Sequence, residues 1–263
     1  MSATPNGEHP LDNPTWAALT NTHTSVAVAN GNAAAYDRQV SVFWGVKGPD
    51  SEGKWDADVW QDVEGLLHKV AGDKAAAATF LTGPDQPPAG WETLLDIECV
   101  QMVGPESESD WPDGPHPPNL DGLRIVELGA ADSADMAELA NATNPGPWRP
   151  RTFELGGYHG FRSTARAAGS GKTERGALVA MAGQRLRPPG WTEISAVCTD
   201  EEHRGQGLAS RLVLDVAFHA RERGSRALLH ASASNTAAIR VYERLGFTLR
   251  RRTTFGVVRT PAA

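Results

Sequence analysis

The chain has 263 residues, a formal net charge of −7 and 22% charged residues, a composition typical of a globular protein. An acidic chain does not attract a phosphate backbone non-specifically, so we expect no nucleic acid partner. No apolar run approaches the roughly 18 residues that a membrane span needs. Residues 1–14 have neither the basic nor the apolar region of a signal peptide. We therefore expect a cytoplasmic protein, a monomer or homodimer, with no membrane partner.

The residue pattern in the first half of the chain predicts a small α/β unit. Apolar residues at helical spacing predict a helix over 58–71, and the other elements expected there are a helix and a strand within 11–30 and strands at 40–46, 75–81 and 94–103. Residues 105–122 hold five prolines and many acidic residues, which is typical of a linker. We accordingly expect a flexible tail over 1–14, an N-terminal α/β domain over 15–105, a linker over 106–122 and a second domain over 123–263.

The second half has a cleaner pattern. The expected order is a strand at 123–128, helices at 133–142 and 152–159, strands at 177–186 and 192–197, a helix at 207–223, a strand at 227–231, a helix at 235–245 and one or two strands within 247–258. This order predicts a mixed α/β sheet flanked by helices. GSGK at 169–172 resembles a phosphate loop, but no helix follows it, so we interpret it as a hairpin loop or insertion.

A strand runs into a glycine-containing turn and a long helix at 197–210, VCTDEEHRGQGLAS. Gly205 and Gly207 allow close backbone approach, and a helix N-terminus offers unpaired N–H groups and partial positive charge. Such a turn binds phosphate groups. Leu208-Ala209 stands where a Walker A loop needs Lys-Ser/Thr, so that loop is excluded.

The spacing Arg204-x-x-Gly207-x-Ala209 resembles the R/Q-x-x-G-x-G/A signature of the GNAT superfamily of acyl-CoA-dependent N-acetyltransferases. A second segment, HASASNTAAIRVYERLGF at 230–247, is similar to the superfamily's next motif. There Asn235, Tyr242 and Leu245-Gly246-Phe247 stand at the family's spacing. The resemblance covers roughly 123–259 and implies a mostly antiparallel GNAT-type sheet.

The resemblance also implies the cofactor site. It implies that acetyl-CoA is the co-substrate and that its pyrophosphate lies on the turn. The implied cofactor-binding residues are Val197, Cys198, Thr199, Arg204, Gly205, Gln206, Gly207, Leu208, Ala209, Ser210 and Asn235. Asn235 has a second interpretation, as the cap of its own helix.

Acyl transfer needs a base for the amine and a proton donor for the leaving thiolate. Tyr242 matches the family's general acid. The resemblance implies two candidate bases. Glu193, on the strand entering the turn, is preferred because many GNAT enzymes carry a glutamate there that acts directly or through water, and His230 on the neighbouring strand is the alternative. Cys198 is better explained as a strand residue than as a nucleophile, and we expect no metal because no residue spacing indicates one.

The sequence therefore predicts an N-acetyltransferase acting on a primary amine of a small molecule, an amino acid or a peptide. The alternative is a non-catalytic acyl-CoA-binding regulatory or scaffold protein. Two interpretations of the N-terminal half stay open, a degenerate GNAT-like half that shapes the acceptor pocket and an unrelated α/β module. A run of arginines at 250–252 is either a solvated edge or a carboxylate-binding element.

Overall fold

The computed structural model describes residues 9–50, 54–72, 76–81, 87–111, 122–163 and 176–261. Its α-helices are α1 (Pro14–Leu19), α2 (Val59–Ala71), α3 (Ser133–Thr143), α4 (Leu208–Glu222) and α5 (Thr236–Arg244). Its strands are β1 (Ala27–Asn30), β2 (Ala33–Tyr36), β3 (Trp44–Val46), β4 (Ala76–Leu81), β5 (Glu92–Val103), β6 (Leu123–Leu128), β7 (Tyr158–Ser163), β8 (Leu178–Gln184), β9 (Trp191–Thr199), β10 (Arg226–Ser232) and β11 (Thr248–Arg259). No helix in these ranges combines the length and the apolarity that crossing a membrane requires.

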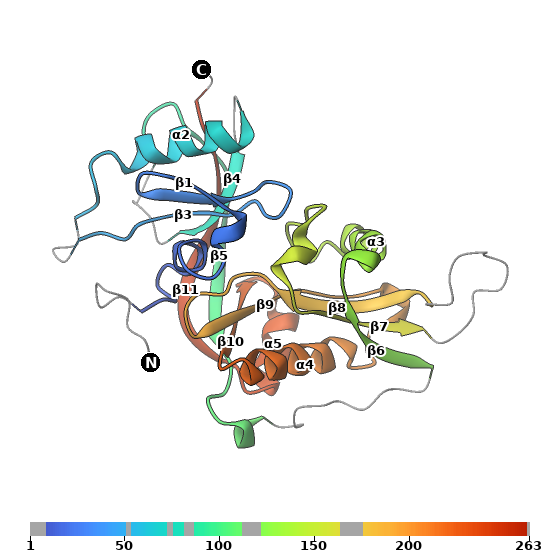
Figure 1. The fold of residues 1–263 in the computed structure, drawn as a ribbon. Helices are drawn as coiled ribbons and strands as arrows, with labels where there is room; N and C mark the ends of the chain where they lie inside the picture. Colours follow the sequence, from blue (N-terminus) through green and yellow to red (C-terminus); the bar gives the residue numbers. More distant parts are fainter. Residues whose placement is uncertain are drawn as a thin grey trace.

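An eight-stranded sheet of order β4-β11-β5-β10-β9-β8-β7-β6 forms the body of the molecule. Every neighbouring pair is antiparallel except β9 and β10, which are parallel. This confirms the expected mixed, mostly antiparallel sheet flanked by helices. Helix α3 packs on β8 and β9 from one side, and α4 packs on β7 to β10 from the other (Figure 1).

The two halves of the chain share this sheet. β5 precedes the expected linker, yet it pairs with β10 and β11, which follow it. Figure 1 shows β5 and β11 running side by side from the large sheet to the smaller one. The domain boundary at 106–122 stays a prediction, and residues 112–121 of it lie outside the described residues.

The smaller sheet, β1-β2-β3, is antiparallel and packs under α2. The apolar face of α2 that the sequence predicts is buried, since Val63, Leu66 and Leu67 have no exposed surface. Strand β2 escaped prediction because its residues, AAAY, carry neither the alternation nor the β-branched side chains that indicate a strand.

Two local expectations were wrong. The helix expected over 152–159 is a 3₁₀ turn at Thr152–Leu155 followed by β7. The flexible tail expected through residue 14 does not extend over its last residues, because Leu11 is completely buried and its carbonyl accepts a hydrogen bond from Gln101. Residues 1–8 of that tail lie outside the described residues.

Candidate active site

A cavity opens where the two parallel strands separate. β9 and β10 pair only from Trp191–Arg226 to Glu193–Leu228, and beyond that point both strands line a cavity of about 830 Å³. The start of α4, the inner face of α5, the loop after α3 and parts of β5 and β11 form its other walls. A volume of this size suits an elongated small molecule.

A bulge in β9 shapes one wall of the cavity. Met181 pairs with Cys198 and Gly183 with Ser195, so the register between β8 and β9 skips Ala196 and Val197. Ala196 has a φ of 52°, a left-handed conformation that costs a non-glycine residue about 1–2 kcal/mol. A bulge changes the direction of the backbone N–H and C=O groups of its strand, so those of β9 can face a ligand in the cavity.

The glycine turn is shaped as the sequence predicts. Gly207 caps α4 with a φ of 76°, and Gly205 has a φ of 79°. A Cβ added to either glycine would meet nothing within 4 Å, so open space lies against the backbone at both positions. The first-turn amides of α4 have no intrahelical acceptor. The turn therefore offers a row of N–H groups and the positive end of a 15-residue helix to an anion.

Polar and cationic side chains surround this turn. His203, Arg204 and Arg244 line the cavity. The guanidinium of Arg204 contacts the carbonyl of Thr199 at 3.4 Å, and the buried hydroxyl of Thr199 has no hydrogen-bond partner among the described residues. A buried unpaired hydroxyl beside a cationic turn is a group that a polar ligand would satisfy. These features fit a phosphate-bearing ligand with a long polar arm, as coenzyme A has.

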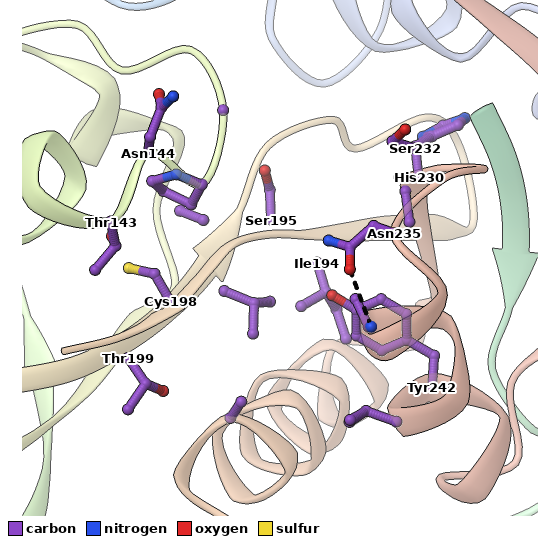
Figure 2. Close-up of a pocket in the computed structure, with 18 of the residues that line it drawn as sticks. Thr143, Asn144, Ile194, Ser195, Cys198, Thr199, His230, Ser232, Asn235 and Tyr242 are labelled. Carbon is purple, nitrogen blue, oxygen red and sulfur yellow. Dashed lines mark hydrogen bonds between the residues drawn. The ribbon is translucent and has the colours of Figure 1, made fainter. Parts of the chain in front are cut away.

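Helix α5 contributes two of the predicted residues. The side-chain oxygen of Asn235 accepts from the amide of Ala238 at 3.1 Å, which confirms its capping role, and Asn235 also lines the cavity. Figure 2 shows the ring of Tyr242 extending from α5 toward Ile194 on β9. Burial raises the pKa of Tyr242 to about 12. Its hydroxyl therefore stays protonated at neutral pH and is available as a proton donor.

Glu193 does not lie where a direct base would. Its side chain is completely buried and is not among the residues that line the cavity. Its carboxylate binds the guanidinium of Arg185 through two contacts, at 3.0 and 2.5 Å, and Nδ1 of His230 at 2.7 Å. Burial opposes the charged form, but Arg185 and His230 outweigh it and lower the pKa of Glu193 to about 2. A carboxylate with so low a pKa is a weak general base at neutral pH.

The neighbouring hydrogen bonds determine the tautomer of His230. Gln101 accepts from Arg250 through its Oε1 and donates from its Nε2 to the carbonyl of Leu11, which sets the orientation of the amide. The same Nε2 lies 3.0 Å from Nε2 of His230, so the histidine accepts there and donates from Nδ1 to Glu193. Both ring nitrogens are thus engaged within the protein.

The N-terminal half supplies one wall of the site. Ile97 and Cys99 from β5 line the cavity beside Phe255 of β11. Arg185, which also lines it, lies over the ring of Phe43 with 4.8 Å between the guanidinium carbon and the ring centroid. No motif marks these residues, because their role depends on the insertion of β5 between β10 and β11. The one signal in the sequence was Arg185, a charged residue near the end of the largely apolar segment 177–186.

The structure brings most of the predicted site residues together. The cavity is lined by Val197, Cys198, Thr199, Arg204, Gly205, Gly207, Leu208, Ala209, Ser210, His230, Asn235 and Tyr242. Glu193 lies behind this wall, and Gln206 does not line the cavity. Burial raises the pKa of Cys198 to about 11, so its thiol is a poor nucleophile, as the sequence suggests.

The arginine run does not reach the cavity. Arg250 and Arg251 both bind Asp12, and Arg252 binds Glu98. β4 pairs with β11 only from Thr254 onward, so the segment with Arg251 and Arg252 is a partly solvated edge, as the sequence suggested. The phosphate-loop look-alike at 169–172 lies outside the described residues.

Comparison with known proteins agrees with this geometry. The family model described as FR47-like protein matches residues 171–256. A crystal structure described as a putative acetyltransferase of the GNAT family from Novosphingobium aromaticivorans is 34% identical, with a TM-score of 0.75. The match covers 97% of this chain and 100% of that one. A GCN5-related N-acetyltransferase from Kribbella flavida shares the fold at 17% identity, with a TM-score of 0.57 over 94% of this chain and 95% of that one.

Curated relatives match over shorter stretches. A mycothiol acetyltransferase from Nocardia farcinica is 33% identical over 143 residues, which is 48% of this chain and 46% of that protein. One from Thermobispora bispora is 46% identical over 57 residues, 21% of this chain and 19% of that protein. The chain therefore spans less than half the length of these curated relatives.

Proposed function

Because this chain belongs to the GNAT family of acetyltransferases, we propose that it transfers an acetyl group from acetyl-CoA to a primary amine of a small molecule, an amino acid or a peptide. One observation carries the proposal: the phosphate-binding turn, the β9 bulge and Tyr242 line a single cavity. An anion site, a proton donor and redirected backbone amides are the parts that acyl transfer from a thioester needs.

We assign separate groups of the chain to the pyrophosphate and to the pantetheine arm of coenzyme A. In this proposal the amides from Gly205 to Ser210 bind the pyrophosphate, and Arg204 adds positive charge. The bulged strand from Val197 to Thr199 lies along the pantetheine arm, with the unpaired Thr199 hydroxyl as one partner. Asn235 lines the opposite wall. Coenzyme A supplies the thioester, whose carbonyl is the electrophile.

Two groups assist the transfer. In this proposal the amide of Val197, a residue that the β8–β9 register skips, stabilises negative charge on the carbonyl oxygen. The hydroxyl of Tyr242 donates a hydrogen bond to the departing sulfur. With a pKa of about 12, that hydroxyl keeps its proton over the working pH range.

In this proposal Glu193 does not remove the proton from the acceptor amine directly. The neutral amine attacks, and its proton leaves through water in the cavity, with the Arg185–Glu193–His230 group holding the wall in place. This revises the role expected for Glu193 from base to positioning residue. The reason is that the carboxylate of Glu193 is buried and is bound by both Arg185 and His230.

The acceptor binds at the end of the cavity built by Ile97, Cys99 and Phe255. These side chains offer a mostly apolar wall, to which Ser195 and Ser232 add hydroxyls. Such a wall suits an amine with a largely apolar side chain. Supplying this wall is the function that we propose for the N-terminal half.

A thiol-release screen tests the proposal. The full chain is incubated with acetyl-CoA and a panel of amino acids, free-amino peptides and small amines, and free thiol is measured. We expect acceptor-dependent release for at least one class. Binding of acetyl-CoA without release across the panel would identify a non-catalytic binding protein instead.

Gly207→Trp tests the cofactor turn, and Gly224→Trp is its matched control. Gly224 ends the same helix with a φ of 73° and an equally open Cβ position, so both variants carry the same backbone strain of about 1–2 kcal/mol. Gly207→Trp is expected to abolish coenzyme A binding in calorimetry, whereas Gly224→Trp keeps it. Equal affinities in the two variants would refute the placement of the pyrophosphate.

A further inference from the structure

A second group of reactive side chains lies outside the cavity, where α4 packs on β7. Asp215 and His219 are four residues apart on α4 and therefore share a helix face. His159 reaches them from β7. The potential ligand atoms of the three residues all lie within 4.8 Å of one another. None of the three lines the cavity.

The carboxylate of Asp215 is buried with one oxygen unsatisfied. Its side chain is 8% exposed, and Oδ2 lies 2.5 Å from Nδ1 of His159 and 3.6 Å from Nδ1 of His219. Both contacts are ion pairs when the histidines are protonated, and Oδ2 has no hydrogen-bond partner among the described residues. A buried carboxylate is costly unless a cation or a donor compensates it. The oxygen therefore faces two imidazole nitrogens within ion-pair distance and accepts a hydrogen bond from neither.

His219 makes the kind of hydrogen bond that metal-binding histidines make. Its Nδ1 lies 2.8 Å from the carbonyl oxygen of Asp215 and donates there, so Nε2 is the nitrogen that would bind an ion. Metal-binding histidines typically hold their second nitrogen in this way. His219 also lies in the last turns of α4, where the helix dipole favours positive charge.

We propose that His159, Asp215 and His219 bind one divalent transition-metal ion of the zinc type. Two imidazoles and one carboxylate form a donor set that such ions prefer, and three protein ligands leave a fourth position for water. The His219 side chain is 33% exposed and gives the ion access, whereas those of His159 and Asp215 are 12% and 8% exposed.

The site would attach α4 to β7. His219 lies about 16 Å along the helix from Leu208, at 1.5 Å per residue. The ion is therefore remote from the glycine turn and acts on the packing of α4, not on the acyl transfer. No sequence spacing indicates the site, because β7 and α4 are far apart in the chain.

Cobalt titration of the metal-stripped, untagged chain tests the proposal. We expect saturable binding of one Co²⁺ per chain with the visible d–d bands of a tetrahedral site, displacement by Zn²⁺ and a rise in melting temperature. His219→Ala is expected to weaken Co²⁺ binding at least tenfold. Asp215→Asn tests the carboxylate, with circular dichroism to verify folding.

His68→Ala is the matched control. His68 pairs with Glu64 at the same four-residue helical spacing, with 27% of its side chain exposed, and the described residues place no third ligand beside it. This variant should bind Co²⁺ as the parent chain does. The proposal is overturned if the parent chain shows no saturable binding at millimolar metal, or if His219→Ala binds as tightly as the parent. Either result would make the trio an ion-paired group without metal.

Discussion

Replacing Glu193 by glutamine would remove one negative charge from the interior and leave Arg185 without its counter-ion. The change keeps the shape of the side chain, so packing is almost unaltered. Arg185 is only 14% exposed and Glu193 is not exposed at all. The cost is therefore that of a buried charge left unpaired, which is about 3–5 kcal/mol.

The pKa of Glu193 gives an independent magnitude. Arg185 and His230 lower it from an ordinary 4.5 to about 2, which corresponds to about 3 kcal/mol at roughly 1.4 kcal/mol per pKa unit. Because the folded-state pKa lies below the unfolded one, this stability is fully present above pH 4.5. It is lost as the pH falls toward 2.

Urea unfolding at several pH values measures the effect. At pH 7 we expect Glu193→Gln to unfold with about 3 kcal/mol less free energy and an unchanged m-value. The difference should shrink between pH 4.5 and 2, as the parent chain loses its own carboxylate charge. A difference below 1 kcal/mol at pH 7, or one that is constant down to pH 2, would refute the reasoning.

Glu98→Gln is the control for this experiment. Glu98 pairs with Arg252 on the surface, where the two side chains are 62% and 64% exposed. Solvent screens such a pair, so its loss should cost less than about 1 kcal/mol. Arg185→Met, alone and combined with Glu193→Gln, completes a double-mutant cycle, in which a coupling near zero would show that the two buried charges do not depend on each other.

Two further predictions concern the proton donor and a second buried group. Tyr242→Phe should lower the turnover rate at least tenfold while coenzyme A affinity stays within about twofold; an unchanged rate would remove Tyr242 from the chemistry. Burial and nearby Arg187 lower the pKa of His23 to about 4 from an ordinary 6.5. Its contribution, about 3 kcal/mol, is therefore present above pH 6.5 and lost as the pH falls toward 4. His23→Gln should flatten the pH dependence of unfolding in that window, and an unaltered slope would count against this assignment.

The sequence by itself determined the cofactor side of the site. The glycine turn at Gly205 and Gly207, the cap at Asn235 and the placement of Tyr242 depend on local geometry. Short spacings on one strand, one turn and one helix determine where such groups point. The helix face of α4 and the mixed sheet follow from hydrophobic periodicity for the same reason.

Only the tertiary structure decided the groups that meet across elements. From its own strand alone, Glu193 is expected to be an accessible base. In the structure, Arg185 and His230 approach from neighbouring segments of the sheet and enclose it. β5 enters the sheet from the other half of the chain, and His159 reaches Asp215 only because β7 packs on α4. Contacts between segments distant in sequence leave no periodic signal, so burial and charge pairing at these positions depend on the fold.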